Sequence, residues 1–290
     1  MLVVIGSLIV AGAVVGGYLM EGGHLEVLMQ PAEFVIIGGA MIGSLVIGTP
    51  PKVLKMMVGS VKGLFASALV KSDYLDLLAM LYELFRVVQQ SGIMGLESHF
   101  DNPTESTILS KYQKFLGRHH ALDFLSDSVK VIMTGGILPH DLEALMDEDL
   151  HIHHEEAMRP AGALAKVGDA LPGLGIVAAV LGVVITMGAI DGPASEIGHK
   201  VGAALVGTFL GILLSYGFVQ PLSSNIEASL GDESHYTQCI KAGLLASYKG
   251  FAPAIAVEFA RRVIPGDVRP GFDETEKYCR APRAEQAQAA

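Results

Sequence analysis

A run of histidines and carboxylates is the first feature of this sequence that could do chemistry. It occupies residues 151–156 in the order His-Ile-His-His-Glu-Glu. On a helix, His151 shares a face with His154 and with Glu155, and imidazole and carboxylate groups are ligands for zinc. A metal site also needs another ligand fixed by the fold, and this stretch is acidic, as a solvated helix surface is. We therefore expect no metal ligands here, and keep a metal-dependent membrane enzyme as a minor alternative.

Motifs for nucleophilic and phosphate chemistry are missing from the sequence. It has no Gly-x-Ser-x-Gly turn and no Gly-x-x-x-x-Gly-Lys-Ser/Thr loop. A formal net charge of −10 argues against nucleic-acid binding, which needs a basic surface. Cys239 and Cys279 lie in a polar C-terminal segment with neither disulfide nor metal-ligand spacing, so two free thiols in a reducing cytoplasm are expected. We predict no enzyme, no catalytic residue and no cofactor.

Four polar residues lie within or beside long apolar segments: Glu33, Asp169, Thr186 and Thr208. Ionisable residues inside a membrane segment are functional by default, but Glu33 and Asp169 are at segment ends. We expect Glu33 to be exposed to lipid headgroups; for Asp169, headgroup exposure and a functional role both stay open. Thr186 could bond only to its own preceding helical turn. Thr208 is flanked by glycines, and close packing would direct its hydroxyl towards a neighbouring helix. No carboxylate lies mid-membrane, so an ion pathway would need one from a partner.

Apolar segments long enough to cross a bilayer occur four times. Residues 171–188 and 201–221 each provide about the 20 residues that a spanning helix needs, and residues 2–20 and 34–47 form two more. The chain is 51% hydrophobic and 17% charged, too apolar for an ordinary soluble protein. A secretory signal peptide at 2–20 is disfavoured because no basic region precedes it. Pro172 and Pro221 each stand at one end of a segment, where proline can bend a helix.

The distribution of lysine and arginine predicts how the chain is threaded. Residues 21–30 and 191–197 contain neither, whereas four lysines follow the second apolar segment. By the positive-inside rule, residues 51–168 and both termini are cytoplasmic. We predict an all-α membrane protein with four transmembrane helices and a helical cytoplasmic domain inserted between spans two and three. Its predicted parts are residues 1–50 with spans one and two, 51–168 as the cytoplasmic domain, 169–221 with spans three and four, and 222–290 as a cytoplasmic helical tail.

The predicted cytoplasmic domain has helical patterns and no strand pattern of useful length. Residues 74–88 and 121–132 are amphipathic near a 3.6-residue period, and residues 141–158 form an acidic helix after a glycine-containing turn. The last residues, from 281 onward, are rich in Ala, Gln and Glu and are expected to be disordered.

Several stretches of the sequence closely resemble one family. They are Gly-Gly-Tyr-Leu-Met at 16–20, Gln-Pro-Ala-Glu-Phe-Val-Ile-Ile-Gly-Gly-Ala at 30–40, Glu-Ala-Leu-Met-Asp-Glu at 143–148, Val-Gly-Asp-Ala-Leu-Pro-Gly-Leu-Gly-Ile-Val-Ala-Ala-Val at 167–180, Val-Gly-Thr-Phe-Leu-Gly-Ile-Leu-Leu-Ser-Tyr-Gly-Phe at 206–218 and Ala-Pro-Ala-Ile-Ala-Val-Glu-Phe-Ala-Arg-Arg at 252–262. In order and along essentially the whole chain, they resemble MotA, the family of ion-channel subunits of bacterial flagellar stators, within the MotA/TolQ/ExbB proton channel family.

This resemblance implies a multi-pass protein of the bacterial inner membrane. It implies a homo-oligomer, a pentamer around a dimer of the single-span protein MotB, whose membrane aspartate admits protons and whose complex turns against the rotor protein FliG. Pro172 and Pro221 match prolines credited with coupling protonation to movement. Ala179 stands where sodium-driven relatives have threonine, and a methyl group cannot coordinate sodium, so protons are the expected ion. Thr208 matches a threonine found in both types.

The same resemblance suggests a surface that contacts the rotor. Glu97 matches an acidic residue of that surface, but the basic partner falls on uncharged Gln89. Arg86 lies about one turn earlier and could supply the charge. If one helix ran from Arg86 to Glu97, the two would share a face, but Gly92 and Gly95 are residues at which that helix can break.

ExbB and TolQ, energisers of envelope transport complexes, are the alternative relatives. They have one span before their cytoplasmic domain, and the two predicted here favour the flagellar branch.

Overall fold

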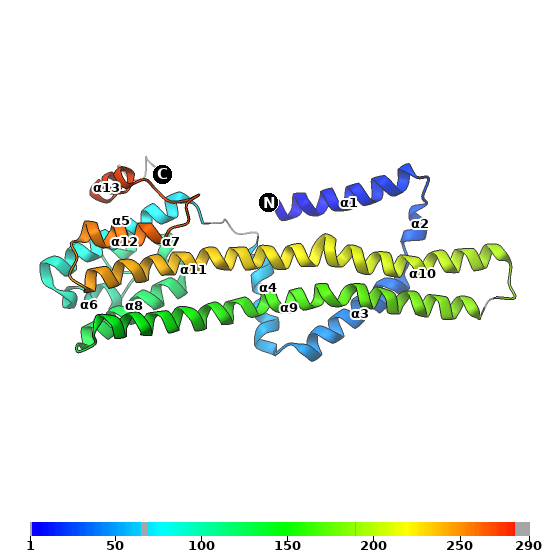
Figure 1. Cartoon of the computed structure of the whole chain (residues 1–290), viewed down its shortest axis with the longest axis horizontal. Coiled ribbons are helices and arrows are strands. Elements are labelled where there is room, and N and C mark those ends of the chain that lie inside the picture. Colours follow the sequence, from blue (N-terminus) through cyan, green and yellow to red (C-terminus); the bar gives the residue numbers. More distant parts are fainter. Residues whose placement is uncertain (1, 65–68, 189, 282–290) are drawn as a thin grey trace. The chain divides into compact units, whose positions relative to one another are not determined.

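The computed structural model describes residues 2–64, 69–188 and 190–281, and every regular element in these ranges is helical (Figure 1). The elements of the first half are α1 (Leu2–Met20), α2 (Leu25–Leu28), α3 (Pro31–Gly48), α4 (Pro51–Gly63), α5 (Lys71–Ser91), η1 (Ile93–Leu96), α6 (Glu97–Asp101), η2 (Leu109–Lys111), α7 (Gln113–Leu116) and α8 (His119–Thr134). Those of the second half are α9 (Pro139–Met187), α10 (Ala194–Leu214), η3 (Ser215–Val219), α11 (Gln220–Tyr248), α12 (Pro253–Val263) and α13 (Phe272–Arg280). The tail expected to be disordered lies almost wholly outside the described residues.

Candidate membrane spans number four within the described ranges, as the sequence predicts. They are Leu2–Met20, Leu25–Gly48, Pro139–Met187 and Ala194–Tyr248. The third and fourth extend well beyond the apolar segments. The acidic helix expected at 141–158 and the span expected from 171 are one helix of 49 residues, α9, with Pro160 and Pro172 inside it. A charged helix and a spanning helix can thus be one element, because hydropathy changes along a helix without breaking its backbone hydrogen bonds.

The chain divides into two compact units. The first, here called the membrane unit, comprises residues 1–67 and 157–229, and the second, the helical unit, comprises residues 68–156 and 230–290. Helices α9 and α11 each contribute residues to both units.

The membrane unit has a small buried core and a large apolar surface. Its buried apolar side chains are Ile37, Val167, Leu171, Ala178, Val206 and Leu210. No residue of α1 is buried, and large apolar side chains such as Val184, Ile185 and Leu205 are exposed. Exposed apolar surface of this extent suits contact with lipid tails or with other membrane helices, because its exposure to water would be unfavourable.

Helix α5 is the centre of the helical unit, where it packs against α12 and α13. Its buried face includes Leu78, Leu81 and Phe85, which follow the amphipathic pattern of the sequence. The C-terminal half of the unit contributes Cys239, which is fully buried in this core. The sequence had placed Cys239 in a polar segment; the structure places it in the core, where burial raises the pKa of its thiol to about 12. It is a free, packed thiol, as is the partly buried Cys279.

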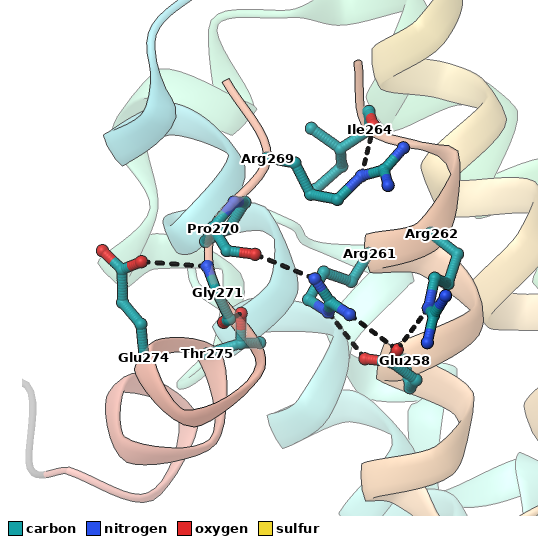
Figure 2. Close-up of polar contacts among 9 residues, drawn as sticks. All are labelled: Glu258, Arg261, Arg262, Ile264, Arg269, Pro270, Gly271, Glu274 and Thr275. Atoms are coloured by element: carbon teal, nitrogen blue, oxygen red, sulfur yellow. Dashed lines mark hydrogen bonds and ion pairs between the residues drawn. The ribbon is translucent and has the colours of Figure 1, made fainter. Parts of the chain in front are cut away.

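A buried arginine organises the motif at 252–262 (Figure 2). The Arg261 side chain donates two hydrogen bonds to the Glu258 carboxylate, at 2.6 and 2.7 Å, and a third to the Pro270 carbonyl oxygen at 2.9 Å. Hydrogen bonding from Arg261 lowers the pKa of Glu258, so the pair stays ionised. Arg261 therefore ties the segment before α13 to the end of α12, and the motif has a structural task in the helical unit.

Candidate functional site

Pro172 interrupts the hydrogen bonding of α9 near the membrane unit's core. Proline has no backbone N–H, so in a regular α-helix the carbonyl four residues earlier, that of Gly168, loses its donor. In the structure, the Ser215 hydroxyl donates to the Gly168 carbonyl oxygen at 2.6 Å. Ser215 is fully buried, and Gly168 is buried as well. The carbonyl freed by Pro172 is therefore satisfied from another helix.

Ser215 begins the second irregularity of the unit. Residues Ser215–Val219 form a π-helical turn, and the Gln220 N–H donates to the Ser215 carbonyl oxygen, five residues back. Pro221 follows at once, and its ring would crowd the carbonyl of Gly217 in a tight α turn. A wider π turn before the proline relieves that crowding, and π turns recur at functional sites. The two prolines expected to couple movement thus belong to neighbouring backbone irregularities.

Helices α9 and α10 run side by side and touch backbone to backbone close to these irregularities (Figure 1). A Cβ atom added to Gly211 would lie 2.5 Å from the Leu171 carbonyl oxygen, and one added to Gly175 would lie 2.8 Å from the Gly207 carbonyl oxygen. Glycine is required at such positions because any side chain would push the helices apart. Gly175 and Gly211 therefore let α9 and α10 approach closely.

Asp169 takes part in the same neighbourhood. Its Oδ1 atom accepts a hydrogen bond of 2.8 Å from the Gln220 side-chain amide, and both residues are at least partly exposed. Gln220 is the residue before Pro221 and was not singled out from the sequence. Together with Ser215 and Gly168, this pair links residues 168–169 of α9 to residues 215–220. The Ser215–Gly168 and Gln220–Asp169 bonds thus lie beside Pro172 in α9 and at the two ends of the π turn before Pro221.

Three other residues singled out from the sequence, Ala179, Thr186 and Thr208, lie on α9 and α10. Thr186 is fully buried and its hydroxyl donates to the Gly182 carbonyl oxygen at 2.8 Å, on its own preceding turn. Thr208 and Ala179 are both partly exposed, on α10 and α9 respectively. The neighbours Gly207 and Ala178 are buried against each other.

The environment of Glu33 differs from the one expected from the sequence. Instead of facing headgroups, its side chain is 94% covered: the residue is 6% exposed, and its Oε2 atom has no hydrogen-bond partner among the described residues. A Cβ atom on Gly207 would lie 2.5 Å from that oxygen. Glu33 shares a helix face with the buried Ile37, four residues later, and that spacing is the signal that could have indicated its burial.

The residues expected at a rotor contact are exposed on the helical unit but do not share one helix. Arg86 and Gln89 lie on α5, and Glu97 is the first residue of α6. Helix α5 ends at Ser91, and Gly92 has a φ of 73°, the left-handed region that ends helices and favours glycine. A continuous helix from Arg86 to Glu97 is therefore wrong, and their common face cannot be inferred from helical spacing.

The histidine-rich stretch is divided between two environments. His151 pairs with Glu155 at 3.4 Å on an exposed face. The His153 ring stacks on the His120 ring of α8, with centroids 3.1 Å apart, and burial lowers the pKa of both. No group of three or more potential metal ligands occurs in the described part of the chain.

Comparison with known proteins decides which branch the chain represents. Residues 4–92 match the family described as Motility protein A N-terminal, and residues 117–238 match the MotA/TolQ/ExbB proton channel family. Motility protein A of Salmonella typhimurium is 46% identical over 284 residues, 98% of this chain and 96% of that protein. The chain belongs to the motility protein A family.

Solved structures agree with the fold. The chain resembles a subunit of C. jejuni MotAB with a TM-score of 0.75 at 18% identity, covering 91% of this chain and 96% of that one. It also resembles the flagellar MotAB stator complex of Bacillus subtilis with a TM-score of 0.72 at 21% identity, covering 92% and 96%. The full-length similarity to motility protein A, with the N-terminal family model, favours the flagellar branch over ExbB-like and TolQ-like energisers, as the sequence predicts.

Proposed function

We propose that this chain is the channel subunit of a flagellar stator, which uses proton flow to generate torque. The full-length similarity to motility protein A supports the flagellar role, and the matched proton channel family supports ion conduction. The geometric observation that carries the proposal is the junction of the two prolines, where the carbonyl freed by Pro172 is bonded to the π turn before Pro221. Two neighbouring helix irregularities form a hinge that can adopt two angles at low cost.

A partner must complete the ion pathway. Within the described membrane unit, Glu33 is the buried carboxylate, and it lies at the start of α3. We infer that a MotB-like single-span protein brings a membrane aspartate, and that five copies of this chain surround a dimer of it in the inner membrane, with both termini and residues 51–168 cytoplasmic. The lysines after the second span support this orientation.

Protons are the proposed ion because Ala179 stands where sodium-driven relatives of this family have threonine, and a methyl group cannot coordinate sodium. No further cofactor is required by the proposal. The matched variant is Ala179→Thr, which introduces a hydroxyl at the same position. Rotation of the unmodified motor should stop when a protonophore collapses the proton gradient, and should not depend on external sodium.

The decisive experiment is restoration of rotation in flagellated cells that lack their own stator. The chain is expressed with and without a MotB-like partner, and rotation of tethered cells is measured. Rotation is expected only with both proteins, and expression of this chain alone should give no proton flux into vesicles. A chain that reaches the membrane with its partner yet gives no rotation would contradict the proposal. Restored transport across the outer membrane in cells lacking an ExbB-like energiser would favour the alternative function.

The proposed rotor contact with FliG uses charges on the helical unit. Arg86 and Glu97 are both exposed, and charged surfaces that meet a complementary partner act more strongly at low salt. Glu97→Lys should reduce torque and be partly rescued by a charge reversal on the rotor protein. Asp127→Lys, at an exposed acid of α8, is the matched control and should leave torque unchanged. Equal effects of the two reversals would mean that Glu97 is an ordinary surface charge.

A further inference from the structure

The bond between Ser215 and Gly168 is distinguished by the carbonyl that it reaches. Hydroxyls in helices commonly bond to the carbonyl four residues earlier on their own helix. Thr186, Thr237 and Ser60 do so, with Gly182, Glu233 and Met56 as acceptors. Ser215 instead reaches across to α9 and selects the single carbonyl that Pro172 deprives of its amide donor.

The Ser215 side chain is shielded from water. It is fully buried, so water does not compete for its hydroxyl, and the helices on either side are in backbone contact through Gly175 and Gly211. The hydroxyl takes the place of the amide that proline lacks. A buried carbonyl without this donor would carry a large desolvation penalty.

We propose that Ser215 is a latch on the Pro172 hinge, a positioning residue that holds α9 and α10 at the angle seen in this structure. A change of angle at the hinge breaks the bond between Ser215 and Gly168. The Gly168 carbonyl oxygen then needs water as its hydrogen-bond donor. Removing the hydroxyl leaves the carbonyl unsatisfied in the latched arrangement only, and so shifts the equilibrium towards the released one. The assignment of Pro172 as a hinge rests on the proposed function; the bond itself does not.

A double-mutant cycle tests the latch directly. In Pro172→Ala the new residue supplies an amide N–H to Gly168, which makes the Ser215 hydroxyl redundant. Amide hydrogen exchange is measured for residues 163–178 in the complex purified with its partner. Ser215→Ala is expected to increase opening of this segment about tenfold when Pro172 is present, and by less than about twofold in the Pro172→Ala background.

Ser223, on α11, provides a control because its hydroxyl also bonds across to a carbonyl of α9. Its hydroxyl is buried and donates to the Ala161 carbonyl oxygen at 2.8 Å, but that carbonyl has its regular amide donor, Ala165, in α9. Ser223→Ala should therefore have the same effect in both backgrounds. An equal effect of Ser215→Ala in both backgrounds would overturn the latch, because Ser215 would then be an ordinary packing hydroxyl.

Rotation measurements separate this inference from the proposed function. Ser215→Ala should lower torque at high load while leaving the amount of assembled complex unchanged. If the exchange cycle shows the predicted coupling but the unmodified chain drives no rotation, the latch stands and the stator function is overturned. If the chain drives rotation but the cycle shows no coupling, the function stands and the latch is overturned.

Discussion

Gly211→Ala is the sharpest test of the backbone contact between α9 and α10. The added Cβ atom would lie 2.5 Å from the Leu171 carbonyl oxygen and 2.9 Å from the Cα atom of Gly175. Close carbon–oxygen contacts in proteins are about 3.3–3.6 Å, so the methyl group overlaps the carbonyl by roughly 1 Å. Both neighbours are backbone atoms, which cannot move away by changing rotamer. The helices must separate, and the contacts that bracket the hinge are lost.

Two opposing contributions to the free energy of unfolding set the size of the effect. Replacing glycine by alanine inside a helix gains about 0.5–1 kcal/mol, because alanine has less conformational freedom to lose. Overpacking a well-packed site costs about 1–3 kcal/mol, and a backbone obstruction belongs at the upper end. We expect a net loss of about 1–2 kcal/mol for Gly211→Ala. Gly202 on the same helix is the control, since a Cβ atom there meets nothing within 4 Å.

The assay is thermal unfolding of the complex purified with its partner, at one scan rate for all variants. For a protein of this size, 1 kcal/mol corresponds to roughly 2–4 °C in the unfolding midpoint. Gly211→Ala should therefore lower the midpoint by about 2–8 °C, and Gly202→Ala should leave it unchanged or raise it slightly. Equal midpoints for the two variants would refute the reasoning, because the α9–α10 contact would then have space for a side chain.

Two further predictions concern the hinge and the helical unit. Pro172→Ala and Pro221→Ala should leave membrane insertion and partner binding intact but abolish motility, because a straightened helix cannot change angle; normal swimming at normal protein levels would exclude a hinge. The stacked His120 and His153 should make the helical unit less stable in acid: burial holds the pKa of both below the ordinary 6.5, so the stability that they contribute is present above pH 6.5 and is lost as the pH falls below it. The unfolding midpoint temperature should decrease when the pH is lowered from 7.5 to 5.5, and it should decrease by less in His153→Gln. An identical decrease in the variant would show that other groups cause it.

Hydropathy, length and local glycine signals were sufficient to predict much of the fold. The span expected at 2–20 is α1 with the same bounds, and the amphipathic segments at 74–88 and 121–132 lie within α5 and α8. These predictions succeed because the hydropathy and the helical periodicity of a segment depend only on residues close together in the sequence. Gly92 also signalled its own break, although the sequence could not say that α5 would end there.

The environment of single polar residues was much less predictable. Glu33 was expected among headgroups and is buried against Gly207, and Cys239 was expected in a polar segment and is in the core of the helical unit. Both errors have one cause: burial depends on which other helix covers a side chain, and neighbours in sequence do not report it. Asp169, beside the start of the apolar segment, is exposed, and its hydrogen-bond partner Gln220 lies 51 residues away in the sequence.

The sequence by itself determined the family, the apolar segments and the presence of two prolines at helix positions where proline removes a hydrogen bond. Only the tertiary structure decided what replaces that bond. Gly168 and Ser215 are 47 residues apart, and neither has a neighbour in sequence that would indicate their pairing. The pairing exists because Gly175 and Gly211 let two helices touch closely enough for one hydroxyl to reach the other's free carbonyl. Local chemistry sets which backbone groups are left without partners, and helix packing sets which side chains can reach them.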